Sequence, residues 1–155
     1  MYPFFLFLHS LGRWLTLLSL LSMIMISLRG LTIRQKFTPA ANTLRHWTAT
    51  IAHIQLLLGM FLYFRSPVVR SPLPPDPYHL VDEHTYFRYI HITLMLIAVI
   101  VITIGSAKAR RAQEDRAKFR TLLAWFAAGL LILLIAIPWP FSPLAGRPLF
   151  RSYSS

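Results

Sequence analysis

The chain has 155 residues, of which 55% are hydrophobic and only 14% are charged. This composition excludes an ordinary soluble domain, in which about 25% of the residues are charged. The formal net charge of +11 is typical of nucleic-acid-binding proteins. Here, however, the basic residues lie at the ends of long apolar stretches, so the sequence favours a membrane protein that binds no nucleic acid.

Four apolar stretches each approach or exceed the roughly 20 residues that a helix needs to cross a bilayer core of about 30 Å. Only helix bundles and closed barrels satisfy their backbone hydrogen bonds in a bilayer. We therefore predict an all-α, integral membrane, four-helix up-down bundle over residues 1–141, followed by a short, loosely ordered tail over 142–155. The predicted spans cover residues 4–28, 44–64, 84–105 and 119–137.

The first span carries His9, Gly12 and Arg13. No basic segment precedes its apolar run and no A-x-A site follows it, so we expect a retained span and not a cleaved signal peptide. The chain contains no cysteine, which excludes disulfides, thiolate ligands and covalently attached c-type haem.

The second span carries His53 and Gly59, and Asn42 or Thr43 is the expected N-cap of its helix. The connection that follows, 65–81, contains five prolines and cannot be helical throughout. We expect this connection to form an extended flap over one mouth of the bundle.

The third span begins near the acidic pair 82–83, which suits a helix N-terminus. His84, Arg88, His91 and Met95 follow at spacings of four, three and four residues, so they share one face of an α-helix. An ionisable side chain inside a membrane span is costly and marks a candidate functional site.

The fourth span ends at the motif Pro138-Trp139-Pro140-Phe141, whose aromatic residues suit the membrane interface. Ala124 and Ala128, spaced by four residues, predict close packing of this helix against a neighbour.

Four crossings place both termini and the proline-rich connection on one side of the membrane, the terminal side. The connections 29–43 and 107–120 lie on the other, the basic side. The basic side has ten Lys and Arg residues, counting Arg45 at the start of the second span, and the terminal side has six, counting Arg13 and Arg88 near the mouth of the bundle. The positive-inside rule then places the basic side in the cytoplasm and both termini in the periplasm of a bacterial inner membrane.

His9 and His91 lie at similar depths below the terminal side, within about 5 Å at a helical rise of 1.5 Å per residue. In an up-down bundle the first and third spans are diagonal partners. Two such histidines can hold a haem iron through both axial positions. His53 lies near mid-membrane, where it would contact the ring, a quinone or a water, or replace His9 as the partner of His91.

Two arginines and two glycines fit this arrangement. Arg13 and Arg88 each share a helix face with one of the two histidines, near the side where haem propionates need cations. Gly12 and Gly59 would let a flat ring approach the backbone.

The motifs L-H-S-L-G-R-W (8–14), A-H-I-Q-L-L-L-G (52–59), H-x3-M-L-I-A (91–98) and I-P-W-P-F (137–141) resemble a family of short bacterial four-helix membrane proteins labelled cytochrome b-like. The resemblance covers most of the chain except the proline-rich connection and the tail. It implies b-type haem, electron transfer, and one histidine in each of the first three spans, at His9, His53 and His91.

The chain departs from the family pattern at one position. The family commonly has Glu before the histidine of the third span, whereas this chain has Ile90 there and a Glu83-His84 pair seven residues earlier. Whether His84 or His91 carries the role stays open at this point.

The leading prediction is thus a membrane-embedded haem b protein for electron transfer, with a quinone or the subunits of a respiratory complex as partners. One alternative is a cofactor-free accessory subunit whose histidines serve packing and whose basic side binds anionic lipid or a partner. Another is a three-histidine site for copper or zinc. The sequence contains no hydrolase or phosphate-loop motif, so any enzymatic role is at most a redox one.

Overall fold

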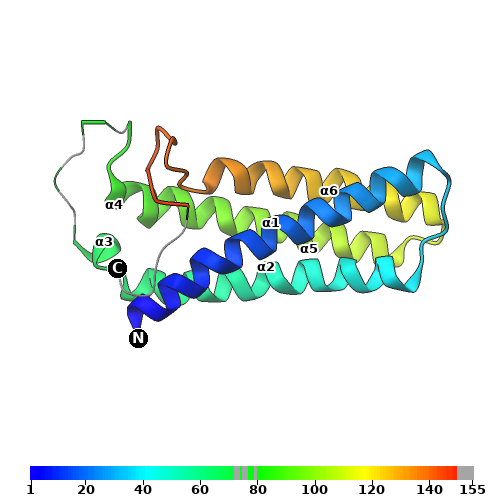
Figure 1. The fold of residues 1–155 in the computed structure, drawn as a ribbon, viewed down its shortest axis with the longest axis horizontal. Helices are drawn as coiled ribbons and strands as arrows, with labels where there is room; N and C mark the ends of the chain where they lie inside the picture. Colours follow the sequence, from blue (N-terminus) through cyan, green and yellow to red (C-terminus); the bar gives the residue numbers. More distant parts are fainter. Residues whose placement is uncertain (72–73, 75–76, 79, 150–155) are drawn as a thin grey trace.

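The computed structural model of the chain is a bundle of four long helices (Figure 1). It describes residues 1–71, 74, 77–78 and 80–149, and within these ranges it contains no strand. The all-α four-helix fold predicted from the sequence is confirmed. In chain order, the elements are α1 (Tyr2–Thr32), α2 (Pro39–Arg65), the short α3 (Pro67–Arg70), α4 (Glu83–Thr85), the π-helical η1 (Tyr86–His91), α5 (Ile92–Arg111) and α6 (Asp115–Ala136).

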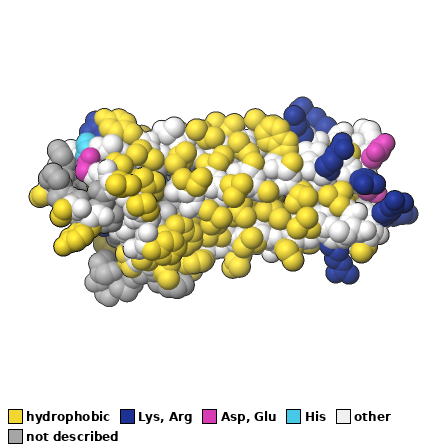
Figure 2. Space-filling view, turned by 90° about the horizontal axis from the view of Figure 1, so that it is seen from above, with side chains coloured by type: hydrophobic (Ala, Val, Ile, Leu, Met, Phe, Trp, Pro, Cys, Tyr) yellow, Lys and Arg dark blue, Asp and Glu magenta, His cyan; other side chains and the backbone are white. Residues whose placement is uncertain are grey.

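Four helical stretches are long and apolar enough to cross a bilayer, the third being α4, η1 and α5 in succession. The shortest, α6, has 22 residues, which at 1.5 Å per residue gives about 33 Å. Hydrophobic side chains cover the middle of the bundle surface, while Lys and Arg gather at one end (Figure 2). Leu57, Met25 and Leu131 are each more than 60% exposed on this surface. The chain is therefore a multi-pass membrane protein whose apolar surface contacts lipid.

The helices form a ring in which α1 packs against α2 and α6, and α5 packs against the same two helices. This arrangement makes α1 and α5 the diagonal pair, as expected for an up-down bundle. Leu20, Met23, Ile102, Leu122 and Phe126 are fully buried in the shared core. Side chains on α1 and α5 can therefore face each other across the centre of the bundle, although the two helices are not neighbours in the ring.

The two ends of the bundle differ as the sequence predicted. Met1, the described residues of the connection 66–82 and residues 137–149 lie at one end, and the loops 33–38 and 112–114 lie at the other (Figure 1). The helices are longer than the predicted spans, because hydropathy bounds the apolar stretch and the helices continue past it.

The helix caps partly differ from expectation. The N-cap of α2 is Thr38, whose Oγ1 accepts a hydrogen bond from the Ala41 N–H at 3.2 Å, and not Asn42 or Thr43. Pro39 then takes the first helical position, which its fixed φ suits. Asp82 caps the third span as predicted, with the Thr85 N–H 2.9 Å from Oδ1. Hydrogen bonds from Thr85 hold the pKa of the Asp82 carboxyl below its ordinary value.

The expectation of a loosely ordered tail is wrong for residues 142–149, which pack against the terminal side. Ala145 is fully buried, and the Leu80 N–H donates to the Pro143 carbonyl at 2.9 Å. The proline-rich connection begins with the helical turn α3 and not with an extended segment. The prediction for residues 72–73, 75–76 and 79 lies outside the described residues.

Close helix packing uses glycines and not the predicted alanine pair. Ala124 and Ala128 are exposed on the outer surface of α6. Gly129 instead faces α5, where an added Cβ would lie 2.6 Å from Cγ1 of Ile102 and 3.7 Å from the Ala98 carbonyl oxygen. The contact between α5 and α6 therefore depends on the missing side chain at this position.

This packing predicts that Gly129→Val destabilises the bundle. Overpacking of this kind costs about 1–3 kcal/mol because the neighbouring side chain must leave its rotamer. Thermal unfolding in detergent measures the loss, with Ala128→Val, an exposed position on the same helix, as the control. Equal stability of the two variants would contradict the packing described here.

Candidate functional site

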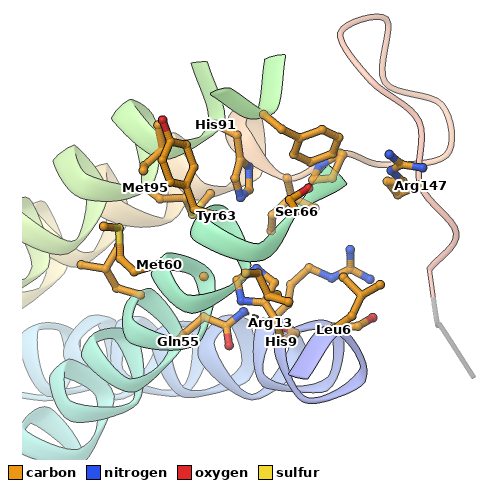
Figure 3. A pocket seen from close by; sticks show the side chains of 18 of the residues that line it. Leu6, His9, Arg13, Gln55, Met60, Tyr63, Ser66, His91, Met95 and Arg147 are labelled. Carbon is orange, nitrogen blue, oxygen red and sulfur yellow. Dashed lines mark hydrogen bonds between the residues drawn. The ribbon is translucent and has the colours of Figure 1, made fainter. Parts of the chain in front are cut away.

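A cavity of about 350 Å³ lies between the helices near the terminal side. This volume falls within the range of about 300–1,000 Å³ that is usual for small-ligand sites. The lining comes from α1, α2, α3, η1, α5 and the end of α6, and it is mostly apolar. Figure 3 shows His91 and His9 pointing toward each other from opposite sides of this space.

The imidazole of His91 is held by a backbone carbonyl. Its Nδ1 lies 2.7 Å from the Ala136 carbonyl oxygen. Since a carbonyl oxygen only accepts, Nδ1 carries the proton, and the neutral ring keeps an unprotonated Nε2. Histidines that ligate a metal typically donate their other ring N–H in this way, which fixes the tautomer and makes the ligand more basic.

The Ala136 carbonyl is available because α6 ends at this residue, and a proline excludes the donor that a continued helix would offer. Ala136 is the last residue of α6, and in a continued helix its carbonyl would accept from the N–H of residue 140. That residue is Pro140, which has no N–H. The fully buried Tyr86 also donates its hydroxyl to the same oxygen at 2.7 Å. Two side chains of η1 thus replace one missing backbone donor.

The second proline of the motif acts in the same way. Pro138 removes the donor that would have reached the Leu134 carbonyl, and Trp139 Nε1 donates to that oxygen at 2.9 Å instead. The motif Ile137–Phe141 therefore ends α6 with its two freed carbonyls satisfied by side chains.

His9 faces His91 from α1, and its ring packs over Gly59 of α2. A Cβ added to Gly59 would lie 3.1 Å from Cε1 of His9, so the glycine makes room for the ring. Nδ1 of His9 is buried and has no hydrogen-bond partner among the described residues. Such an atom costs about 1–3 kcal/mol, so it indicates a place for a water or a bound group.

Gln55 joins α2 to the turn that carries His9. Its Nε2 donates to the His9 carbonyl at 2.8 Å, and its side chain occupies the place where Gly12 lacks a Cβ. Side chains of the protein thus occupy the space beside both predicted glycines: the His9 ring at Gly59 and the Gln55 amide at Gly12. Gly59 lines the cavity, whereas Gly12 lies behind Gln55.

Arg88 does not line the cavity, although it lies three residues before His91. Its Nη1 is 3.2 Å from Nε2 of His84, outside the site. The reason is η1: a π-helix bonds i to i+5 and has a wider turn, so residues three apart no longer share a face as they do in an α-helix. Of the two candidate histidines of the third span, the structure brings His91 and not His84 to the cavity.

Two arginines lie at the mouth of the cavity. Arg13 lines it as predicted, and its guanidinium donates to the Leu149 carbonyl of the tail. Arg147, for which the sequence predicted no role, also lines it, and its Nη2 lies 2.6 Å from a carboxylate oxygen of Glu83. Arg147 and Pro148 of the tail therefore line this end of the cavity, and Arg147 supplies one of its two cations.

His53 lies away from the cavity, on the outward face of α2. Its Nδ1 is 2.7 Å from the Ala49 carbonyl, and its Nε2 is 3.2 Å from the hydroxyl of Thr103. Across the described residues, no three His, Asp or Glu side chains lie close enough to hold one metal ion. The structure thus places two of the three predicted histidines, His9 and His91, at the cavity and the third outside it.

No sequence pattern predicted a role for Tyr86, Gln55 or Arg147 in the site. The position of Pro140, four residues after Ala136, indicates from the sequence alone that the Ala136 carbonyl has no backbone donor in a continued helix. Nothing in the sequence pairs Arg147 with Glu83, because 64 residues separate them.

No protein family, curated protein or solved structure matches the chain in our comparisons. The cytochrome b-like label therefore stays a prediction, and the site is judged by its geometry.

This geometry predicts that His91 of the protein without added cofactor is the neutral tautomer protonated at Nδ1. The ¹⁵N shifts and two-bond couplings of labelled imidazoles report the tautomer, with His91→Gln assigning the signal. Tyr86→Phe should leave the tautomer unchanged and cost about 0.5–1.5 kcal/mol for one lost hydrogen bond. A ring protonated at Nε2 would contradict the assignment.

Proposed function

We propose that the protein binds haem b inside the membrane, with His9 and His91 as axial ligands, and that it transfers electrons. The observation that carries the proposal is the hydrogen bond from His91 Nδ1 to the Ala136 carbonyl at 2.7 Å. It leaves Nε2 as a free donor of an electron pair, on a ring that points into the cavity toward His9 (Figure 3). Neutral imidazole is a common haem ligand.

The lining of the cavity supports the same group. Apolar side chains exclude water, and the guanidinium groups of Arg13 and Arg147 lie at the mouth, where they would pair with propionates. The volume of about 350 Å³ is at the low end for a ligand site. A flat macrocycle would therefore have to displace part of the lining, and the tail residues at the mouth are the part outside the helices.

Haem b supplies one-electron exchange between ferric and ferrous iron. His9 and His91 would hold the iron from both sides and leave no position open for a substrate, which favours electron transfer over chemistry at the metal. The chain holds each imidazole from a different helix of a diagonal pair, so the ligands do not depend on one loop. The electron donor or acceptor would be a membrane-soluble quinone or another subunit of a respiratory complex.

The other two functions considered from the sequence have less support. A three-histidine copper or zinc site needs His53, which lies outside the cavity. A purely structural role for the histidines leaves unexplained the buried Nδ1 of His9, which has no partner among the described residues.

The haem proposal predicts a low-spin haem spectrum for the purified protein after expression with ample haem. His9→Ala and His91→Ala should each abolish the low-spin reduced-minus-oxidised signal, because each removes one axial ligand. His53→Ala is the matched control and should keep the signal. Loss of the signal in His53→Ala with His9→Ala intact would overturn the ligand pair, and a wild-type protein without haem would overturn the function.

We also propose that the basic side faces the cytoplasm of a bacterial inner membrane and that both termini are periplasmic. The ten basic residues of that side against six on the other support this orientation. Reporter fusions after Ser155 and within the loop 112–114 are expected to give periplasmic and cytoplasmic signals, respectively. The reverse pattern would invert the orientation and place the histidine cavity near the cytoplasm.

A further inference from the structure

A second pocket, of about 400 Å³, lies at the basic side, at the opposite end of the bundle from the histidine cavity. It is formed where α2 begins, α5 ends and α6 begins. Arg110 of α5 and Lys118 of α6 line it, together with Phe37 and Asn42. Lys118 Nζ also lies 5.5 Å from the centre of the Phe37 ring, which holds the ammonium group at the pocket wall.

A buried arginine contacts Asn42 of the pocket wall. Arg45 is only 7% exposed, and its Nε donates to Oδ1 of Asn42 at 3.0 Å. Its Nη1 donates to the carbonyl and the hydroxyl of Ser106, at 3.3 and 2.5 Å. All of these acceptors are neutral. A buried charge is costly unless an opposite charge compensates it.

The protein supplies little negative charge at this end. Residues 29–45 and 107–120 contain ten basic side chains and two acidic ones, Glu114 and Asp115. Asp115 lies 3.8 Å from Lys118 with its side chain 41% exposed, so the pair is weak. Among the described residues, no carboxylate forms an ion pair with Arg45 or Arg110. The charge balance therefore calls for an external anion.

The depth of the pocket identifies the source of that anion. Helix α2 has 27 residues, or about 40 Å at 1.5 Å per residue, against a hydrocarbon core of about 30 Å. Its first few residues thus extend into the headgroup layer, where phosphates are concentrated. The exposed Trp47, eight residues further along α2, is a residue type that favours this boundary. Apolar side chains cover the bundle surface next to this end (Figure 2).

We propose that this pocket binds the headgroup phosphate of an anionic phospholipid, with Arg110 and Lys118 as its cations and Arg45 adding positive charge next to Asn42. Basic pockets between membrane helices are known to take anionic lipid headgroups. The acyl chains would remain on the apolar outer surface, which a free phosphate could not use.

The test compares two double variants that remove the same charge from the wild-type chain. Arg110→Gln with Lys118→Gln changes the pocket, whereas Arg111→Gln with Arg116→Gln changes exposed residues that do not line it. Each protein is reconstituted in nanodiscs of phosphatidylglycerol and phosphatidylcholine and then released for native mass spectrometry. The wild type and the control should retain phosphatidylglycerol over phosphatidylcholine on the order of ten-fold, and the pocket variant should lose this preference.

Two results would overturn the proposal. An equal loss in both double variants would mean that lipid responds to diffuse charge and not to this pocket. Thermal protection by inorganic phosphate alone, lost only in the pocket variant, would mean that the anion is soluble and not a lipid. If the pocket double variant does not fold, Arg110→Gln alone is compared with Arg111→Gln alone. All of these measurements are made without haem.

Discussion

The arrangement of the histidine cavity depends on one backbone carbonyl, that of Ala136. Inside a bilayer no water satisfies a free carbonyl, so the end of a membrane helix must find donors within the protein. Pro140 removes the donor that the helix itself would provide, and the donors come from Tyr86 and His91 of η1. This contact ties the end of α6 to the start of the third span and fixes the orientation of the His91 ring. The tautomer of the proposed ligand is thus a consequence of how the neighbouring helix ends.

Charge at the terminal side is organised around the tail. Arg13 reaches the Leu149 carbonyl and Arg147 reaches Glu83, so two arginines hold α1, the third span and the tail together. In a partly apolar setting such contacts are stronger than on a wet surface, because the effective dielectric constant is lower. The same guanidinium groups are the cations at the cavity mouth. An anionic group bound there would compete with the Leu149 carbonyl and the Glu83 carboxylate for these guanidinium groups. Occupancy of the site would therefore be coupled to the position of the tail.

The sequence was sufficient for the fold and for part of the site. Hydropathy defined four spans, and helical rise with diagonal placement brought His9 and His91 together, because both follow from regular helix geometry. It failed where a helix departs from regularity: η1 turned Arg88 away from the face it was predicted to share with His91. It also failed where rotation about the helix axis mattered. In a membrane the outer and inner faces are both apolar, so no periodic pattern distinguishes them, and His53, Ala124 and Ala128 were assigned to the interior although all three are exposed.

The position of the two histidines restricts how the proposed electron transfer can be used. His9 is the eighth residue of α1, which places it only about 11 Å from the start of that helix. The other half of the bundle core is filled by packed side chains such as Leu20, Met23 and Leu122. A single redox group at this depth exchanges electrons near one surface and does not by itself carry them across the bilayer. A role in transmembrane charge movement would need a second redox centre, supplied by a partner subunit, whereas exchange with a quinone in the terminal leaflet would need no further group from this chain.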